Sequence, residues 1–260
     1  MSRPLLYGHR GAAGVAPENS YVSFATALAD GASALELDVH RTRDGEVVVF
    51  HDDDGRRMAH VAARIAEVDF KELAGWDLGH GFAGDTAFVG RGLTPPLLRD
   101  VIRGFRGVPI NIDLKSHDPR LREATIALIT QEDAVERVVI ASFHDDVIDA
   151  VHDSGSAVRT SLGKRGVQVL RLAPMFIVKR ALRRHIERGG TRVQIPPQAG
   201  GIRLDSAAFI ARCHALGFAV DYWVINDVTQ ARELLARGAD GLISDHPARL
   251  APLFAKPLAG

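Results

Sequence analysis

Residues 8–52, GHRGAAGVAPENSYVSFATALADGASALELDVHRTRDGEVVVFHD, decide the fold because they place several chemically reactive side chains beside short apolar runs. The stretch contains His9, Arg10, Glu36, Asp38 and His51. His9 follows the apolar run at 5–7, and the two acids lie within the apolar run at 34–39. A side chain at the end of a strand can project into a shared site, which is where we expect His9 to lie.

The run at 34–39 has the alternation of a β-strand, in which successive side chains point to opposite faces. Glu36 and Asp38 would share one face, opposite two leucines and Val39. An exposed strand would leave these acids in water, whereas a parallel-barrel strand would bury the leucines under outer helices and point the acids inward. In the second case a bound cation would offset the repulsion and lost hydration of the carboxylates. Carboxylate oxygens suit Mg²⁺, Ca²⁺ or Mn²⁺ better than zinc.

A second run, at 109–115, favours the inward arrangement. Asn111, Asp113 and Lys115 would share one face of this strand, and aliphatic side chains would occupy the other. We do not expect one chain to contain two solvent-exposed edge strands that both carry acids opposite aliphatic side chains. Asp113 would complete a three-carboxylate metal site with Glu36 and Asp38, and Lys115 would contact an anionic substrate oxygen.

Apolar runs alternate with amphipathic segments along the chain, which is typical of a parallel α/β sheet. The length of 260 residues fits one (β/α)8 TIM barrel, which needs roughly 250 residues. We therefore predict a single barrel domain over residues 1–260. The predicted strands lie near 5–9, 34–39, 109–114, 138–142, 157–161, 192–195, 218–224 and 240–244.

Composition excludes several classes of function. The net charge is zero, so no overall field favours nucleic acid as a partner. The single cysteine, Cys213, excludes an internal disulfide, and its helical context predicts a small core residue rather than a nucleophile. We find no secretory leader pattern and no bilayer-length apolar run, so we expect a cytoplasmic protein.

Five short motifs in residues 8–52 together resemble the glycerophosphodiester phosphodiesterase family. They are His-Arg-Gly, Pro-Glu-Asn, Glu-x-Asp, Asp-Gly and His-Asp, in this order. The resemblance extends over nearly the whole chain through the segments at 111–115, 222–226 and 238–247. In two places the chain departs from the family pattern. Asp113 stands where the family usually has Glu, and Asp is also the residue type at this position in the related sphingomyelinase D toxins. Ser20 stands where Thr is usual.

The resemblance implies a metal-dependent hydrolysis of glycerophosphodiesters to glycerol 3-phosphate and an alcohol. His9 and His51 would form the acid–base pair, because an ordinary histidine pKa suits both roles. The cation, Arg10 and Lys115 would neutralise the phosphate charge. Trp223 would form a wall of the substrate pocket. Two alternatives remain: a phospholipase D-like enzyme acting on lysophospholipids at a membrane surface, and a non-catalytic barrel that only binds.

Several local interpretations stay open at this stage. Asn19 is either the N-cap of the first helix, a position that Ser20 suits equally, or a site residue. Asp52 either orients His51 or ends the strand. The connection at 53–95 is long for a barrel, which is typical of a lid or binding loop. We expect its His60 and His80 to be surface residues.

Residues 159–192 are strongly basic, with ten Lys and Arg and one acid, Glu187. An apolar stripe at helical spacing, formed by Met175, Val178, Leu182 and Ile186, predicts an outer helix that packs on the barrel. The alternative is weak contact of residues 175–188 with an anionic membrane surface, because Phe176 lies off the stripe.

Overall fold

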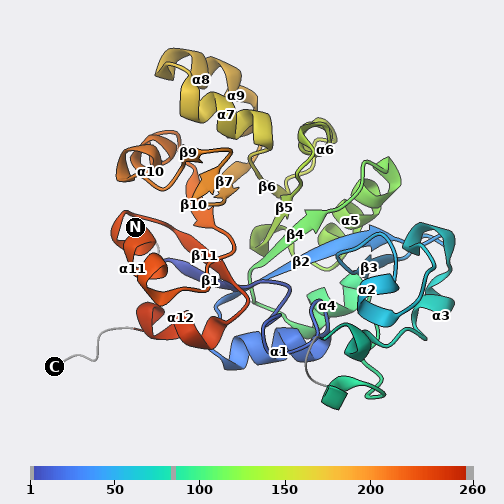
Figure 1. Cartoon of the computed structure of the whole chain (residues 1–260). Helices are drawn as coiled ribbons and strands as arrows, with labels where there is room; N and C mark the ends of the chain where they lie inside the picture. Colours follow the sequence, from blue (N-terminus) through green and yellow to red (C-terminus); the bar gives the residue numbers. More distant parts are fainter. Residues whose placement is uncertain (1–2, 83–85, 256–260) are drawn as a thin grey trace.

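The chain forms a closed parallel (β/α)8 barrel in a computed structural model, which describes residues 3–82 and 86–255 (Figure 1). The first barrel strand pairs with both the second and the last barrel strand, so the sheet closes on itself. The prediction of a single TIM-barrel domain is confirmed. The barrel strands are β1 (Leu5–Gly8), β2 (Ala34–Arg41), β4 (Ile110–Leu114), β5 (Val138–Ala141), β6 (Arg159–Ser161), β7 (Gly190–Ile195), β10 (Ala219–Tyr222) and β11 (Gly241–Ser244).

Helices surround the barrel and lie between successive strands (Figure 1). Ser20 is the N-cap of α1, because its hydroxyl accepts a hydrogen bond from the amide of Ser23. Asn19 is not the cap and belongs to the site instead. The longer outer helices are α1 (Tyr21–Ala29), α4 (Leu98–Gly104), α5 (Pro119–Gln131), α6 (Asp145–Asp153), α10 (Ala207–His214), α11 (Val228–Ala236) and α12 (Pro247–Phe254).

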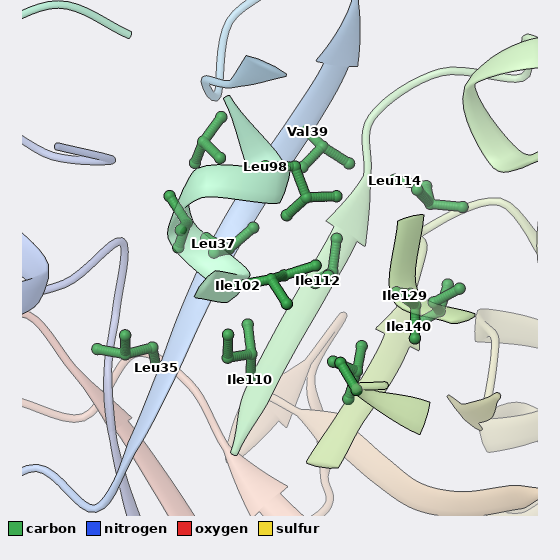
Figure 2. Packing of buried hydrophobic residues seen from close by; sticks show 14 of the residues in the cluster. Leu35, Leu37, Val39, Leu98, Ile102, Ile110, Ile112, Leu114, Ile129 and Ile140 are labelled. Atoms are coloured by element: carbon green, nitrogen blue, oxygen red, sulfur yellow. The ribbon is translucent and has the colours of Figure 1, made fainter. Parts of the chain in front are cut away.

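The aliphatic faces of β2 and β4 point outward, as the alternation predicted. Figure 2 shows the side chains of Leu35, Leu37 and Val39 packed beside those of β4 and against Leu98 and Ile102 of α4. Removing this apolar surface from water stabilises the barrel wall by about 25 cal/mol per Å². Because neighbouring side chains alternate, the same packing forces Glu36 and Asp38 to the barrel interior, where both are buried.

The long connection between β2 and α4 builds a small satellite unit on the barrel. It begins with β3 (Val47–Val49), which pairs antiparallel with the end of β2, and continues through α2 (Arg56–Ala59), a short 3-10 turn (Ile65–Glu67) and α3 (Phe70–Leu73). These elements bury their own apolar cluster around Phe50, Trp76 and Met58. His60 and His80 are exposed, as predicted. The described part of the connection, residues 47–82 and 86–97, therefore has secondary structure and an apolar cluster of its own, and His51 lies at its start.

The basic segment after β6 differs from the predicted single outer helix. It consists of α7 (Lys164–Leu172), α8 (Met175–Ala181) and α9 (Arg183–Glu187), which stand at the outer edge of the molecule (Figure 1). Val178 and Leu182 are buried, but Ile186 is 39% exposed, so the prediction that it belongs to a buried stripe is wrong. The helix ends before Leu182 and a new helix begins at Arg183, so the predicted stripe does not run along one continuous helix.

Two further expectations can be compared with the structure. Cys213 is fully buried in the apolar core, and burial raises the pKa of its thiol to about 12, which confirms a packing role. Within the described residues, each helix is too short or too polar to cross a lipid bilayer.

Candidate active site

The polar side chains predicted from sequence converge where the first three barrel strands end. The loop after β1 supplies His9 and Arg10, the other two strands supply three acids, and Lys115 follows directly after β4. Active sites of this barrel type lie at the carboxyl ends of the strands. The loop after β1 turns sharply at Arg10 and Gly11, whose φ values are 48° and 87°. A side chain on Gly11 would collide with the backbone of Ser23, so glycine is required there.

Arg10 connects both acids of β2 to the loop. Its backbone amide donates to Glu36 Oε2 at 3.0 Å, and its guanidinium Nε lies 3.2 Å from Asp38 Oδ2. Its Nη1 donates to Glu18 Oε1 at 2.9 Å. Glu18 therefore fixes the planar guanidinium over the acidic pair.

Glu36 has little to balance its charge. Burial raises its pKa to about 7, with Asp38 adding repulsion. The nearest titratable base is His9, whose Nε2 lies 3.9 Å from Glu36 Oε2. A carboxylate held in this way gains from any additional positive charge that enters the site.

Asp38 is the most strongly held acid of the group. The Lys115 ammonium lies 2.8 Å from its Oδ1, and Asn19 Nδ2 donates to its Oδ2 at 2.9 Å. Burial alone would raise the pKa of Asp38, but Lys115 and Arg10 outweigh burial and lower it. Asn19 is thus a site residue, with its backbone in the left-handed region at φ 56°.

Asp113 lies opposite Asp38 in the register of β2 and β4, and Lys115 spans the two. The Lys115 ammonium contacts Asp113 Oδ2 at 2.6 Å. Burial raises the pKa of Asp113, and the nearby Asp38 adds to that effect. The three acids, Glu36, Asp38 and Asp113, are buried and lie on adjacent strands, as predicted.

The three carboxylates are not arranged as a ready set of metal ligands in this structure. Among residues 3–82 and 86–255, no three His, Cys, Asp or Glu side chains lie in a metal-ligating arrangement. Lys115 lies between Asp38 and Asp113 and neutralises part of their charge. The donor chemistry still fits a hard cation, because the oxygens are all carboxylate and, among the described residues, no cationic side chain lies within hydrogen-bonding distance of Glu36. The metal site stays a prediction.

His9 is oriented from the far end of the chain. Its Nδ1 lies 2.7 Å from Asp245 Oδ1, just after β11, and Asp245 Oδ2 accepts from Asn226 Nδ2 at 2.7 Å. Burial would lower the pKa of His9, but the hydrogen bond to Asp245 and the charge of Glu36 raise it overall. With Nδ1 bound to Asp245, Nε2 is the nitrogen that faces the acids.

His51 is oriented by its sequence neighbour. Its Nδ1 lies 2.7 Å from Asp52 Oδ1, which supports the orienting interpretation of Asp52. Arg57 then donates from Nε to Asp52 Oδ2 at 2.7 Å and from Nη2 to Glu18 Oε1 at 2.7 Å. Arg57 therefore joins the satellite unit to the loop that carries Arg10.

Two aromatic rings, those of Phe143 and Trp223, lie next to Lys115. Trp223 follows β10, and its ring meets that of Phe143 edge to face, with centroids 5.7 Å apart. The Lys115 ammonium lies 5.8 Å from the centroid of Phe143, whose side chain is exposed. Trp223 thus lies at the site that the resemblance implied.

Sequence reasoning placed all the predicted site residues in the same region but missed four partners of them. Arg57 and Phe143 had no motif to mark them. Asn226 and Asp245 follow predicted strands within the segments 222–226 and 238–247, so their position at strand ends was the signal that could have found them. The four are Arg57, Phe143, Asn226 and Asp245.

Comparison with known proteins agrees with this geometry. The family model described as the glycerophosphoryl diester phosphodiesterase family matches residues 9–249, which includes every residue of the site. The chain belongs to this family. Family membership confirms the expected enzyme class, a phosphoric diester hydrolase.

Individual relatives of this family member have related names. A glycerophosphodiester phosphodiesterase from Bacillus altitudinis is 27% identical, over 94% of this chain and 95% of its own length. A mouse protein named Lysophospholipase D GDPD1 is 25% identical, over 93% of this chain and 83% of its own. A phosphodiesterase from Oleispira antarctica, solved in complex with the product sn-glycerol-3-phosphate, has the same fold with a TM-score of 0.78 at 22% identity, covering 96% of both chains.

Proposed function

We propose that this family member hydrolyses glycerophosphodiesters to glycerol 3-phosphate and an alcohol, with a divalent cation and with His9 and His51 as acid and base. The observation that carries the proposal is a pair of oriented histidines close to the buried acids: His9 lies 3.9 Å from Glu36, and His51 is near enough to lower the pKa of Asp38. Each histidine has Nδ1 held by an aspartate at 2.7 Å, which leaves Nε2 for proton transfer. The product bound to the Oleispira relative supports the choice of substrate.

Arg10 and Lys115 are the protein groups that would neutralise the negative charge of the substrate phosphate. Both are cations inside a site of buried acids, and each contacts Asp38. A planar guanidinium can hold two oxygens of a phosphate at once, and an ammonium can hold a third. The acids that now bind these two cations would share them with the entering phosphate.

Glu36, Asp38 and Asp113 are the residues that would hold the cation. When bound, a hard divalent ion supplies Lewis-acid stabilisation of the charge on the phosphate oxygens. The ion would also offset the cost of burying the negative charge of Glu36, a cost that raises the pKa of this carboxyl group to about 7. Mg²⁺, Ca²⁺ and Mn²⁺ all suit oxygen ligands of this kind.

His9 holds its proton more firmly than a free histidine, because its pKa is raised by Asp245 and Glu36. Protonated Nε2 suits a group that donates to a leaving alkoxide. His51, less buried and fixed through Asp52, would then accept the proton of the nucleophile. The nucleophile is either water or the neighbouring glycerol hydroxyl of the substrate.

Removing the metal gives the direct test. We expect a chelator to abolish hydrolysis of glycerophosphocholine and a hard divalent cation to restore it. A ligand present at 100 times its Kd stabilises the native state by about 2.7 kcal/mol, so the chelator should lower Tm by several degrees at pH 7.5. The double variant Glu36→Gln/Asp38→Asn should lose both responses. Full activity and an unchanged Tm in the chelator would remove the cation from the proposal.

A second candidate substrate is a lysophospholipid. The name of the mouse relative points to it, and the exposed ring of Phe143, which meets the half-buried ring of Trp223, gives an apolar surface beside Lys115. Parallel assays of glycerophosphocholine and lysophosphatidylcholine, each with the same cation, decide between the two by their kcat/KM values. Phe143→Ala should lower kcat/KM for the lysophospholipid more than for the soluble diester. A folded protein inactive on both would instead be a binding module.

A further inference from the structure

The corner formed by the end of α7 and by α8 exposes large apolar side chains that the barrel does not use. Leu172 is 67% exposed, Phe176 is 75% exposed and Ile177 is 43% exposed. In the part of the chain that the structure describes, four of the ten exposed large apolar side chains lie between residues 172 and 186. A helix that merely covers a barrel would bury such groups, since its apolar stripe faces inward.

The geometry of α8 directs apolar and basic side chains to the same outer side. Val178 is fully buried and marks the face that packs on the protein. Successive residues of an α-helix are rotated by roughly 100°, so Phe176 and Arg180 point nearly opposite Val178. Ile177 and Lys179 flank them, and both are exposed. We call Leu172, Phe176, Ile177, Lys179, Arg180 and Arg183 the α8 surface.

The charge of the α8 surface is not balanced locally. Within residues 3–82 and 86–255, Lys179 and Arg180 make no ion pair, and Arg183 has a long contact of 3.7 Å with Glu187. Residues 164–188 contain eight Lys and Arg and one acid, although the whole chain is neutral with 32 basic and 32 acidic residues. The positive charge is therefore concentrated on this side of the molecule.

We propose that the α8 surface docks the protein onto an anionic lipid membrane. Helices that lie in a membrane interface combine apolar side chains that enter the acyl boundary with Lys and Arg that meet anionic headgroups. Phe176 and Ile177 supply the first property, and Lys179, Arg180 and Arg183 supply the second. The surface goes beyond the catalytic proposal, because none of its residues belongs to the active site.

Co-sedimentation of the full chain with lipid vesicles tests the proposal. The wild type should bind vesicles of phosphatidylcholine with phosphatidylglycerol much more tightly than vesicles of phosphatidylcholine alone, and salt should weaken the binding. Each Lys or Arg near an anionic surface strengthens binding about fivefold. Lys179→Ala/Arg180→Ala should therefore bind at least tenfold more weakly. Phe176→Ser/Ile177→Ser should also bind about tenfold more weakly.

A matched control is available on α11, where Val228 and Arg232 are exposed. Val228→Ser/Arg232→Glu should bind vesicles as the wild type does. All three double variants should keep the wild-type Tm and the wild-type rate on soluble glycerophosphocholine, so that failure of docking is distinguishable from failure of catalysis. Equal binding to both kinds of vesicle, or an equal loss in the α11 control, would overturn the proposal. So would a loss confined to the charge variant, because a site for a soluble polyanion needs no apolar insertion.

Discussion

The two histidine–aspartate pairs of the active site have the same local chemistry but opposite origins in the chain. In each, a ring Nδ1 lies 2.7 Å from an aspartate Oδ1. His51 is held by the next residue, whereas Asp245 is 236 positions away from His9. The side chain of His9 is 18% exposed and that of His51 is 32% exposed.

This difference separates what each pair depends on. The Asp52 pair survives as long as the satellite unit folds, because Arg57 anchors it there. The Asp245 pair exists only when the barrel closes, since β1 and β11 must lie side by side to bring His9 and Asp245 together. His9, the proposed proton donor, is thus tied to closure of the barrel, and His51 is tied to a local turn.

Removing either ring should give the largest effect. His9→Ala and His51→Ala should each lower kcat by about two orders of magnitude or more, as loss of a general acid or base does. Both variants should fold, because neither ring belongs to an apolar core cluster. His60→Ala, a change at an exposed histidine, is the control. Steady-state rates on glycerophosphocholine measure the effect, and near-normal kcat in one variant would remove that histidine from the mechanism.

Removing one aspartate charge at a time tests the comparison itself. Asp245→Asn should lower kcat by about 100-fold and Asp52→Asn by less, since His9 is more buried and relies more on its partner. Asp245 raises the pKa of His9, so Asp245→Asn should also move the corresponding limb of the pH–rate profile to lower pH. Asp52→Asn should leave that limb in place. A profile that does not move in Asp245→Asn would mean that Asp245 is only structural.

Arg10→Lys should lower activity by less than the histidine and aspartate changes do. The guanidinium contacts Glu18 and Asp38 with separate nitrogens, and an ammonium cannot hold both together with a phosphate. We expect kcat/KM to fall roughly tenfold to 100-fold, by analogy with other bidentate phosphate contacts. Arg120→Lys, at an exposed position on α5, should change nothing. An unchanged kcat/KM in Arg10→Lys would place Arg10 away from the substrate.

His152 differs from His9 and His51, because among the described residues its ring makes no hydrogen bond to a carboxylate. His152 Nε2 lies 2.7 Å from the hydroxyl of Thr160, and the ring of His185 is 4.8 Å away. Burial lowers the pKa of His152 to about 4, and repulsion from His185 and Arg184 adds to this. Below about pH 6.5 the histidine is protonated in the unfolded chain but stays neutral in the native state. The free energy of unfolding should therefore fall as the pH drops from about 6.5 to about 4.

The size of this smallest effect should be about 1 to 2 kcal/mol between pH 7 and pH 5, because the unfolded histidine takes up its proton below about pH 6.5 and each further pH unit costs about 1.4 kcal/mol. Urea unfolding at pH 7 and pH 5 measures it. His152→Gln keeps a partner for Thr160 and removes the titration, so its stability should depend less on pH over this range. Equal pH dependence in wild type and His152→Gln would show that other groups are responsible.

Local patterns in the sequence determined most of the barrel and most of the site. Period-two alternation fixed the inward face of β2, since burying three aliphatic side chains forces Glu36 and Asp38 to the other side. The same rule placed Asp113 and Lys115 on the inner face of β4. Strand-end position placed His9. These inferences succeed because backbone geometry links neighbouring residues directly.

Tertiary structure alone decided the partners that belong to distant segments. The sequence left Asn19 open between cap and site, and the structure shows that it donates to Asp38. Asp245 and Arg57 reach the histidine pairs only through closure of the barrel and through folding of the satellite unit. Ile186 fits a helical stripe, yet it lies beyond the helix break at Leu182 and is exposed. The contacts of Asn19 and Asp245 join segments 19 and 236 positions apart, and no local period encodes the distance between such segments.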